Sequence, residues 1–98
     1  MEINVKHGEA MVIELKGRLD TVTSNELLEA FAKEEKKENL VQVDMKELEY
    51  ISSAGLRALL AMKKELAEAG KGLEVLNLNN ICLEVFKVTG FINVLTVK

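Results

Sequence analysis

The sequence predicts an α/β domain with a mixed sheet of four to five strands and helices mainly on one face of the sheet. Three observations point to this fold class. Residues 1–15 alternate apolar and polar positions, residues 40–45 form an apolar run, and two later segments carry apolar stripes with helical spacing. Their order indicates an N-terminal hairpin followed by a βαβαβ unit. Because 98 residues can build only one core, we expect a single domain over residues 1–98.

An opening β-hairpin is expected around the turn His7–Glu9. Ile3 and Val5 alternate with polar neighbours before the turn, and residues 11–15 resume the alternation after it. His7 is therefore interpreted as an ordinary turn residue.

The first helix is expected from about residue 24 to residue 37. Thr23 and Glu26 have the spacing of a capping box, and Val22 and Leu27 flank that box at the spacing of a hydrophobic staple. Residues 40–45 follow with few exposed positions, as expected for an interior strand that runs parallel to the strand before the helix.

The second helix begins near Ser53 or Ala54 and ends at Ala69. Its apolar residues share one side, while lysines and glutamates occupy most of the other side. Gly70 can take the left-handed conformation that ends many helices.

A strand, a short third helix and a last strand complete the predicted fold. The strand covers residues 73–78, and Asn79 or Asn80 can cap the helix that Gly90 closes. Residues 91–97 are expected to form the last short strand.

Polar residues follow each strand that leads into a helix. Since the carboxyl ends of parallel strands share one edge of a sheet, we expect these residues to form one surface. They are Asp20 and Thr21 before the first helix, Ser52, Ser53 and Gly55 at the second, and Asn79 and Asn80 at the third.

The composition excludes several function classes. The 13 basic and 16 acidic residues leave a net charge of −3, which makes nucleic acid and anionic membranes poor partners. No apolar run reaches the roughly 18 residues of a membrane span and no signal peptide is recognisable, so we expect a cytosolic protein. The single cysteine, Cys82, excludes an internal disulfide and a cysteine-based metal site, and its apolar neighbours predict a buried structural thiol.

Catalytic and cofactor sites are not indicated. The only histidine, His7, lies in the predicted hairpin turn and does not supply the base that a nucleophilic serine needs. Residues 70–72 read Gly-Lys-Gly but follow a helix, so they form a turn and not a phosphate-binding loop. No carboxylate pair has metal-ligand spacing. We therefore expect a protein that is not an enzyme and binds no metal or cofactor.

The segment 48–60, between a strand and a helix, has two interpretations. Ser52 and Ser53 can simply end a loop and cap the helix, as serines often do. Alternatively, one of them carries a phosphate, which the unpaired N–H groups and the dipole of a helix start tolerate.

Residues 50–60, Tyr-Ile-Ser-Ser-Ala-Gly-Leu-Arg-Ala-Leu-Leu, together with residues 17–20, Gly-Arg-Leu-Asp, resemble the signature of the STAS domain, in particular that of the bacterial anti-sigma factor antagonists. The resemblance extends over essentially the whole chain, to the Val-Thr-Gly-Phe ending of the third helix at residues 88–91. It implies the STAS fold and a single STAS domain over residues 1–98.

The resemblance also implies a function. Such antagonists bind an anti-sigma factor that is also a serine kinase, and phosphorylation of one serine ends the interaction until a phosphatase restores it. The family pattern is commonly Asp-Ser-(Ser/Thr)-Gly, which places Ser52 at the Asp position and Ser53 at the phosphoacceptor. The implied partner-binding residues are Asp20, Thr21, Ser52, Ser53, Gly55 and Leu56.

Two alternatives remain open at this point. The chain can be a STAS scaffold or a subunit of a signalling or lipid-transport complex in which no kinase acts on it. It can also bind a nucleotide or phosphate at the start of the second helix.

Overall fold

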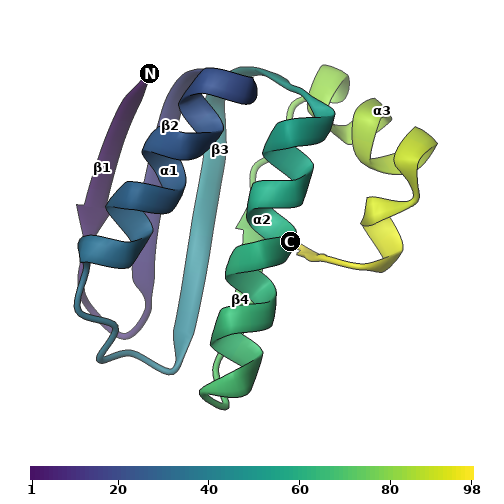
Figure 1. Ribbon diagram of the computed structural model, residues 1–98. Coiled ribbons are helices and arrows are strands. Elements are labelled where there is room, and N and C mark those ends of the chain that lie inside the picture. Colours follow the sequence, from purple (N-terminus) through teal and green to yellow (C-terminus); the bar gives the residue numbers. More distant parts are fainter.

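The computed structural model describes residues 1–98 and contains five strands and three α-helices (Figure 1). The strands are β1 (Glu2–Lys6), β2 (Met11–Leu19), β3 (Leu40–Ile51), β4 (Gly72–Leu76) and β5 (Thr96–Val97). The helices are α1 (Thr21–Lys33), α2 (Ser53–Glu68) and α3 (Asn80–Thr89), and a short 3-10 helix, η1 (Phe91–Asn93), follows α3.

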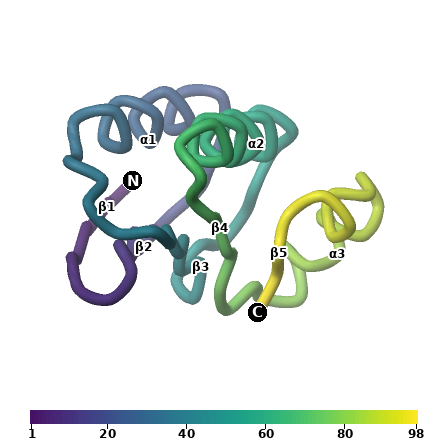
Figure 2. The backbone as a smooth tube through the Cα atoms, turned by 90° about the horizontal axis from the view of Figure 1, so that it is seen from below, coloured from purple at the N-terminus to yellow at the C-terminus, as the bar shows by residue number.

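The strands form one mixed sheet in the order β1-β2-β3-β4-β5. Strands β1 and β2 pair antiparallel, and every later pair is parallel, so the predicted hairpin and crossovers are confirmed. Helices α1 and α2 lie side by side on one face of the sheet, whereas α3 lies beside the β4 and β5 end (Figures 1 and 2).

The core lies between the sheet and these helices. Ile13, Val43 and Val75 pair across three neighbouring strands and are almost fully buried. Leu27 of α1 and Leu59 of α2, both fully buried, belong to the same apolar cluster. The opposite face of the sheet carries polar and charged residues, as expected when only one face is covered.

Helix α1 differs from the prediction at both ends. Asp20, not Thr23, is the N-cap, since its Oδ1 accepts hydrogen bonds from Val22 N and Thr23 N at 3.1 and 3.0 Å. Thr23 completes the capping box by accepting a hydrogen bond from Asp20 N. Val22 is 72% exposed, so the expected staple with Leu27 is absent.

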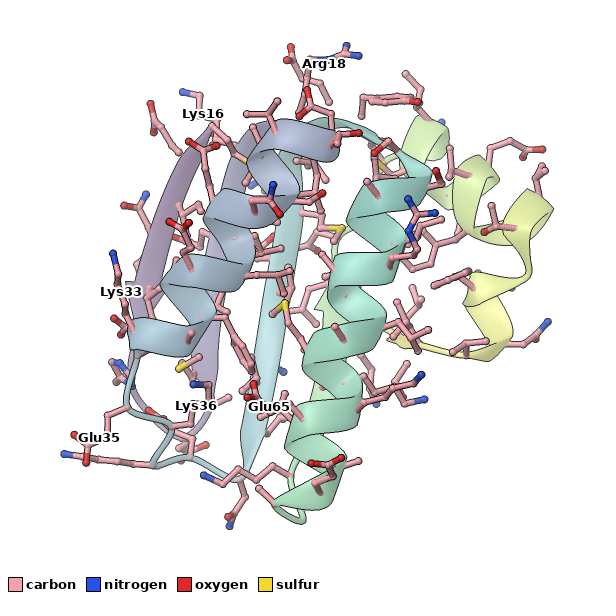
Figure 3. All side chains as sticks on the ribbon, viewed as in Figure 1. Lys16, Arg18, Lys33, Glu35, Lys36 and Glu65 are labelled. Carbon is pink, nitrogen blue, oxygen red and sulfur yellow. The ribbon has the colours of Figure 1, made fainter.

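The same helix ends at Lys33 instead of residue 37. The next residues are held from outside the helix, because the imidazole of His7 bonds Glu34 Oε1 and Glu38 Oε2, each at 2.8 Å. Figure 3 shows Glu35 and Lys36 in the segment beyond the end of α1. His7 does lie in the hairpin turn, but this tertiary contact was not predicted.

Strand β3 extends to Ile51, six residues beyond the predicted end at residue 45. Leu48 and Ile51 are buried, and pairing with β2 continues past two register shifts. Gly17 lies at the second shift with φ of 111°, a conformation that favours glycine.

The C-terminal third also departs from the expected boundaries. Strand β4 ends at Leu76, and Asn77 turns the chain with a positive φ of 59°. Asn79 caps α3, whose residue Cys82 is fully buried as predicted. Only Thr96–Val97 of the predicted last strand is extended. No helix has the length and apolar character needed to cross a membrane.

Candidate functional site

The N-termini of all three helices lie at one edge of the sheet, where β2, β3 and β4 end (Figure 1). Hydrogen bonds join the neighbouring strand ends there. Ser52 N donates to Leu19 O at 2.9 Å, and Asn79 Nδ2 donates to Leu48 O at 2.6 Å. The structure thus places the polar residues that follow the strands on one edge of the molecule.

Ser52 is the N-cap of α2. Its backbone is extended, with φ of −95° and ψ of 174°, and its Oγ accepts a hydrogen bond from Gly55 N at 3.3 Å. The residue is half-buried. Its hydroxyl and its backbone N–H are therefore both used by the fold.

Ser53 is the first residue of α2 and is exposed. Its hydroxyl makes no hydrogen bond within the chain, in contrast to that of Ser52. No acidic residue lies in the first turn of α2, and the dipole of a helix start favours an added negative group. Of the two serines, Ser53 has the hydroxyl that an external enzyme or partner can reach.

Gly55 and Leu56 do not lie on the surface, which corrects their expected role as contact residues. Leu56 is only 1% exposed, and Gly55 is buried. A Cβ atom on Gly55 would lie 2.8 Å from Ile51 Cγ1 and 2.9 Å from Leu19 Cγ. The glycine of the motif therefore allows α2 to pack closely against the ends of β2 and β3, and the leucine anchors the helix in the core.

Asp20 and Thr21 lie at the start of α1, next to α2. The carboxylate of Asp20 is used for capping, and hydrogen bonds from Thr23 backbone N–H and then from its side chain and Val22 lower the Asp20 pKa despite partial desolvation. Thr21 is exposed. Asp20 thus contributes mainly by holding α1 in place, and Thr21 contributes accessible surface.

Three residues of this edge were not predicted. Arg18 extends from the end of β2 (Figure 3), and its guanidinium lies 4.7 Å from the ring centroid of Tyr50. Arg57, on the second turn of α2, lines a shallow hollow between α1 and α2. Cation–π pairing cannot be recognised in the sequence because it depends on the register of β2 and β3. The spacing of four residues between Ser53 and Arg57 on a predicted helix could, in contrast, have been recognised in the sequence as placing both side chains on one face.

The sole histidine lies far from this edge. His7 precedes β2, whereas Ser53 follows β3, and the two strands are parallel, so the residues lie at opposite ends of the sheet. His7 therefore cannot act as a base for Ser53. No group of three or more histidine, cysteine, aspartate or glutamate residues has a geometry suited to a metal ion.

Known proteins resemble this chain over nearly its full length. The family model described as "Mlab, STAS domain" matches residues 4–96. A protein of Bordetella bronchiseptica named as a candidate anti-sigma factor antagonist, BtrV, is 32% identical over 99% of this chain and 85% of its own length.

Solved structures share the fold. The anti-sigma factor antagonist SpoIIAA in its unphosphorylated form superposes with a TM-score of 0.83 at 18% identity, covering 99% of this chain and 88% of that chain. The phosphorylated form of SpoIIAA from Bacillus gives a TM-score of 0.70 at 18% identity, with 99% of this chain and 91% of that chain covered.

Proposed function

The chain belongs to the STAS domain family, and we propose that it is a single-domain anti-sigma factor antagonist that phosphorylation of Ser53 switches off. The relatives named as such antagonists are non-enzymatic regulatory proteins. In this proposal the partner is an anti-sigma factor with serine kinase activity, and a serine phosphatase reverses the modification. The interaction takes place in the cytosol.

The observation that carries the proposal is that the two serines of the motif have different structural roles. Ser52 caps α2, whereas Ser53 is exposed and its hydroxyl is unbonded. Ser52 occupies the position where the family pattern has aspartate, and it retains a side-chain oxygen that caps the helix. A kinase can therefore modify Ser53 without removing any hydrogen bond from the fold.

The proposed docking surface combines accessible and supporting residues. Thr21 and Val22 in the first turn of α1 and Ser53 in the first turn of α2 are exposed, and the two helices are in contact. Asp20 and Ser52 hold the two helix starts in place through their caps. Gly55 and Leu56 are buried beneath this surface and determine how closely α2 packs against the sheet.

Phosphorylation changes this surface electrostatically. A phosphoserine carries roughly −1.5 to −2 charges at neutral pH, and a helix N-terminus accommodates negative charge. The fold should survive the modification. An interface matched to a neutral serine must instead bury or oppose that charge, which costs roughly 2–5 kcal/mol.

Binding titrations with the anti-sigma factor kinases of the same organism test the proposal. We expect Ser53→Asp to weaken binding at least about 30-fold, since roughly 2 kcal/mol corresponds to that factor, while the melting temperature stays nearly constant. Ser53→Asn is the neutral control of similar size. Asn93→Asp adds the same charge at an exposed site in η1. Equal affinities for Ser53→Asp and Ser53→Asn would contradict the switch.

Incubation with each kinase and ATP, followed by intact mass and phosphopeptide mapping, tests the acceptor. The proposal predicts a single phosphate on Ser53. Modification of another residue, or none with any kinase that binds the chain, would contradict it.

A second candidate function is a STAS subunit of a larger assembly without a phosphorylation switch. The name Mlab in the matching family model and the serine in place of the family aspartate favour this alternative. Purification of the chain from its own cell extract distinguishes the two, because the antagonist should copurify with a small ATP-binding kinase. Calorimetry with nucleotides alone tests the remaining possibility of ligand binding at the start of α2, for which we expect no significant heat.

A further inference from the structure

Arg57 is a cation without a partner inside the chain. It is exposed on α2, and its guanidinium makes neither an ion pair nor a hydrogen bond. The only other arginine, Arg18, stacks on Tyr50 and acts electrostatically on Asp20. Arg57 is therefore the one arginine of the protein whose guanidinium has no partner within the fold.

No acidic residue lines the hollow that Arg57 borders. The first turn of α2 has no acidic residue. The hollow that Arg57 lines with α1 consists otherwise of neutral residues: Thr21, Ser24, Asn25, Leu28, Ala54 and Ala58. No carboxylate of this hollow or of the first turn of α2 would thus compete for the guanidinium with an anion introduced here.

Ser53 is the position from which such an anion would reach Arg57. The two residues are four apart on a continuous helix and both are exposed, so their side chains are neighbours on one face, with Cβ atoms roughly 5–6 Å apart. Long side chains of a helix lean toward its N-terminus, which directs Arg57 back over the turn that contains Ser53. An acidic group that precedes a basic one by four residues is the favourable orientation of such a pair.

We propose that Arg57 is the intramolecular counter-ion of the phosphate on Ser53, an inference that rests on the phosphorylation proposed above. Guanidinium and phosphate form charge-assisted, often bidentate hydrogen bonds. Phosphorylation then acts twice on the docking surface, because it adds negative charge at Ser53 and also withdraws the free cation of Arg57. A partner carboxylate that bonds Arg57 in the unmodified protein would lose that contact.

Phosphorus NMR on the protein with phosphoserine incorporated at position 53 during synthesis tests the pair directly. The second ionisation of the phosphate is followed by pH titration in the wild-type sequence and in Arg57→Gln. Because the guanidinium favours the dianion, we expect the phosphate of Arg57→Gln to be about twofold less acidic, a rise of about 0.3 in its pKa. Arg57→Lys keeps the charge and should retain most of the wild-type acidity.

Lys64→Gln is the matched control. Lys64 is also exposed on α2, but it is 11 residues from Ser53, or roughly 16 Å along the helix axis, which exceeds the Debye length of about 8–10 Å at physiological salt. Its removal should leave the titration unchanged. The inference is overturned if Arg57→Gln titrates like the wild type or if Lys64→Gln shifts the titration equally.

This measurement needs neither the kinase nor the partner. Failure of the Arg57 pair would leave the phosphorylation switch to be judged by its own binding and mapping experiments. Conversely, a pair that forms in the synthetic phosphoprotein would stand as chemistry of the chain even if no cellular kinase modified Ser53.

Discussion

Replacement of Gly55 by alanine tests how the serine motif is supported. The added Cβ would lie 2.8 Å from Ile51 Cγ1 and 2.9 Å from Leu19 Cγ, and both of these residues are fully buried. The atoms approached first are not the free ends of flexible side chains, so relief requires a shift of α2 or of the strand ends. Overpacking of this kind costs about 1–3 kcal/mol.

A gain in helix propensity opposes part of this cost. Alanine stabilises a helix by roughly 0.5–1 kcal/mol relative to glycine, so the expected net loss for Gly55→Ala is about 1–2 kcal/mol. For a domain of this size, each kcal/mol lowers the melting temperature by roughly 4–8 °C. Thermal unfolding should therefore show a melting temperature lower by about 5–15 °C. Urea unfolding should show a free energy of unfolding lower by about 1–2 kcal/mol.

Gly8→Ala is the matched control, since the nearest atom to its new Cβ would be Ala10 O at 3.9 Å and its φ is not positive. We expect it to leave stability unchanged or slightly higher. Leu19→Ala in the Gly55→Ala background removes one of the clashing side chains, so the two changes should destabilise by less than the sum of their separate effects. Stability of Gly55→Ala equal to or above that of the wild type would refute the packing argument.

Three further predictions follow from particular contacts. Ser52→Ala removes the α2 cap and should cost about 1 kcal/mol in urea unfolding, and an unchanged midpoint would contradict the capping role. The hydrogen bond to Glu34 and then that to Glu38 raise the pKa of His7 above its ordinary value of 6.5. The protonated imidazole should therefore stabilise the folded protein fully below pH 6.5, and this contribution should decline as the pH rises through the raised pKa of His7 in the folded protein. The stability difference between wild type and His7→Gln should follow this decline, and a pH-independent difference would refute a stabilising role of the His7 hydrogen bonds to Glu34 and Glu38. Burial raises the pKa of the Cys82 thiol, so Ellman's reagent should react slowly with the native protein and at once in denaturant, whereas fast native labelling would show that the helix opens.

Local sequence patterns determined much of the fold. Alternation at Ile3 and Val5 indicated the hairpin, and the apolar run at 40–45 indicated the interior strand. The convergence of the helix starts also followed from the sequence, because parallel strands that alternate with helices necessarily end at the same edge. These features depend on residues close together in the chain or on topology alone.

Helix and strand boundaries depended on distant contacts. Thr23 and Asp20 are both good caps in sequence, and the end of β2 at Leu19, bonded through its carbonyl to Ser52 N, decides in favour of Asp20. The early end of α1 coincides with the hydrogen bonds that His7 makes to Glu34 and Glu38 in the following segment. Single-segment patterns contain no information on either contact, since the partners lie about 30 residues apart.

The candidate site divides in the same way. The sequence by itself identified two serines and a glycine at a strand-to-helix junction, because the motif consists of adjacent residues. Only the tertiary structure assigned Ser52 to the cap, left Ser53 exposed and placed Gly55 against Ile51. The physical reason is that exposure and close packing are properties of surfaces brought together by folding, so they depend on the neighbours that the other strands and helices supply.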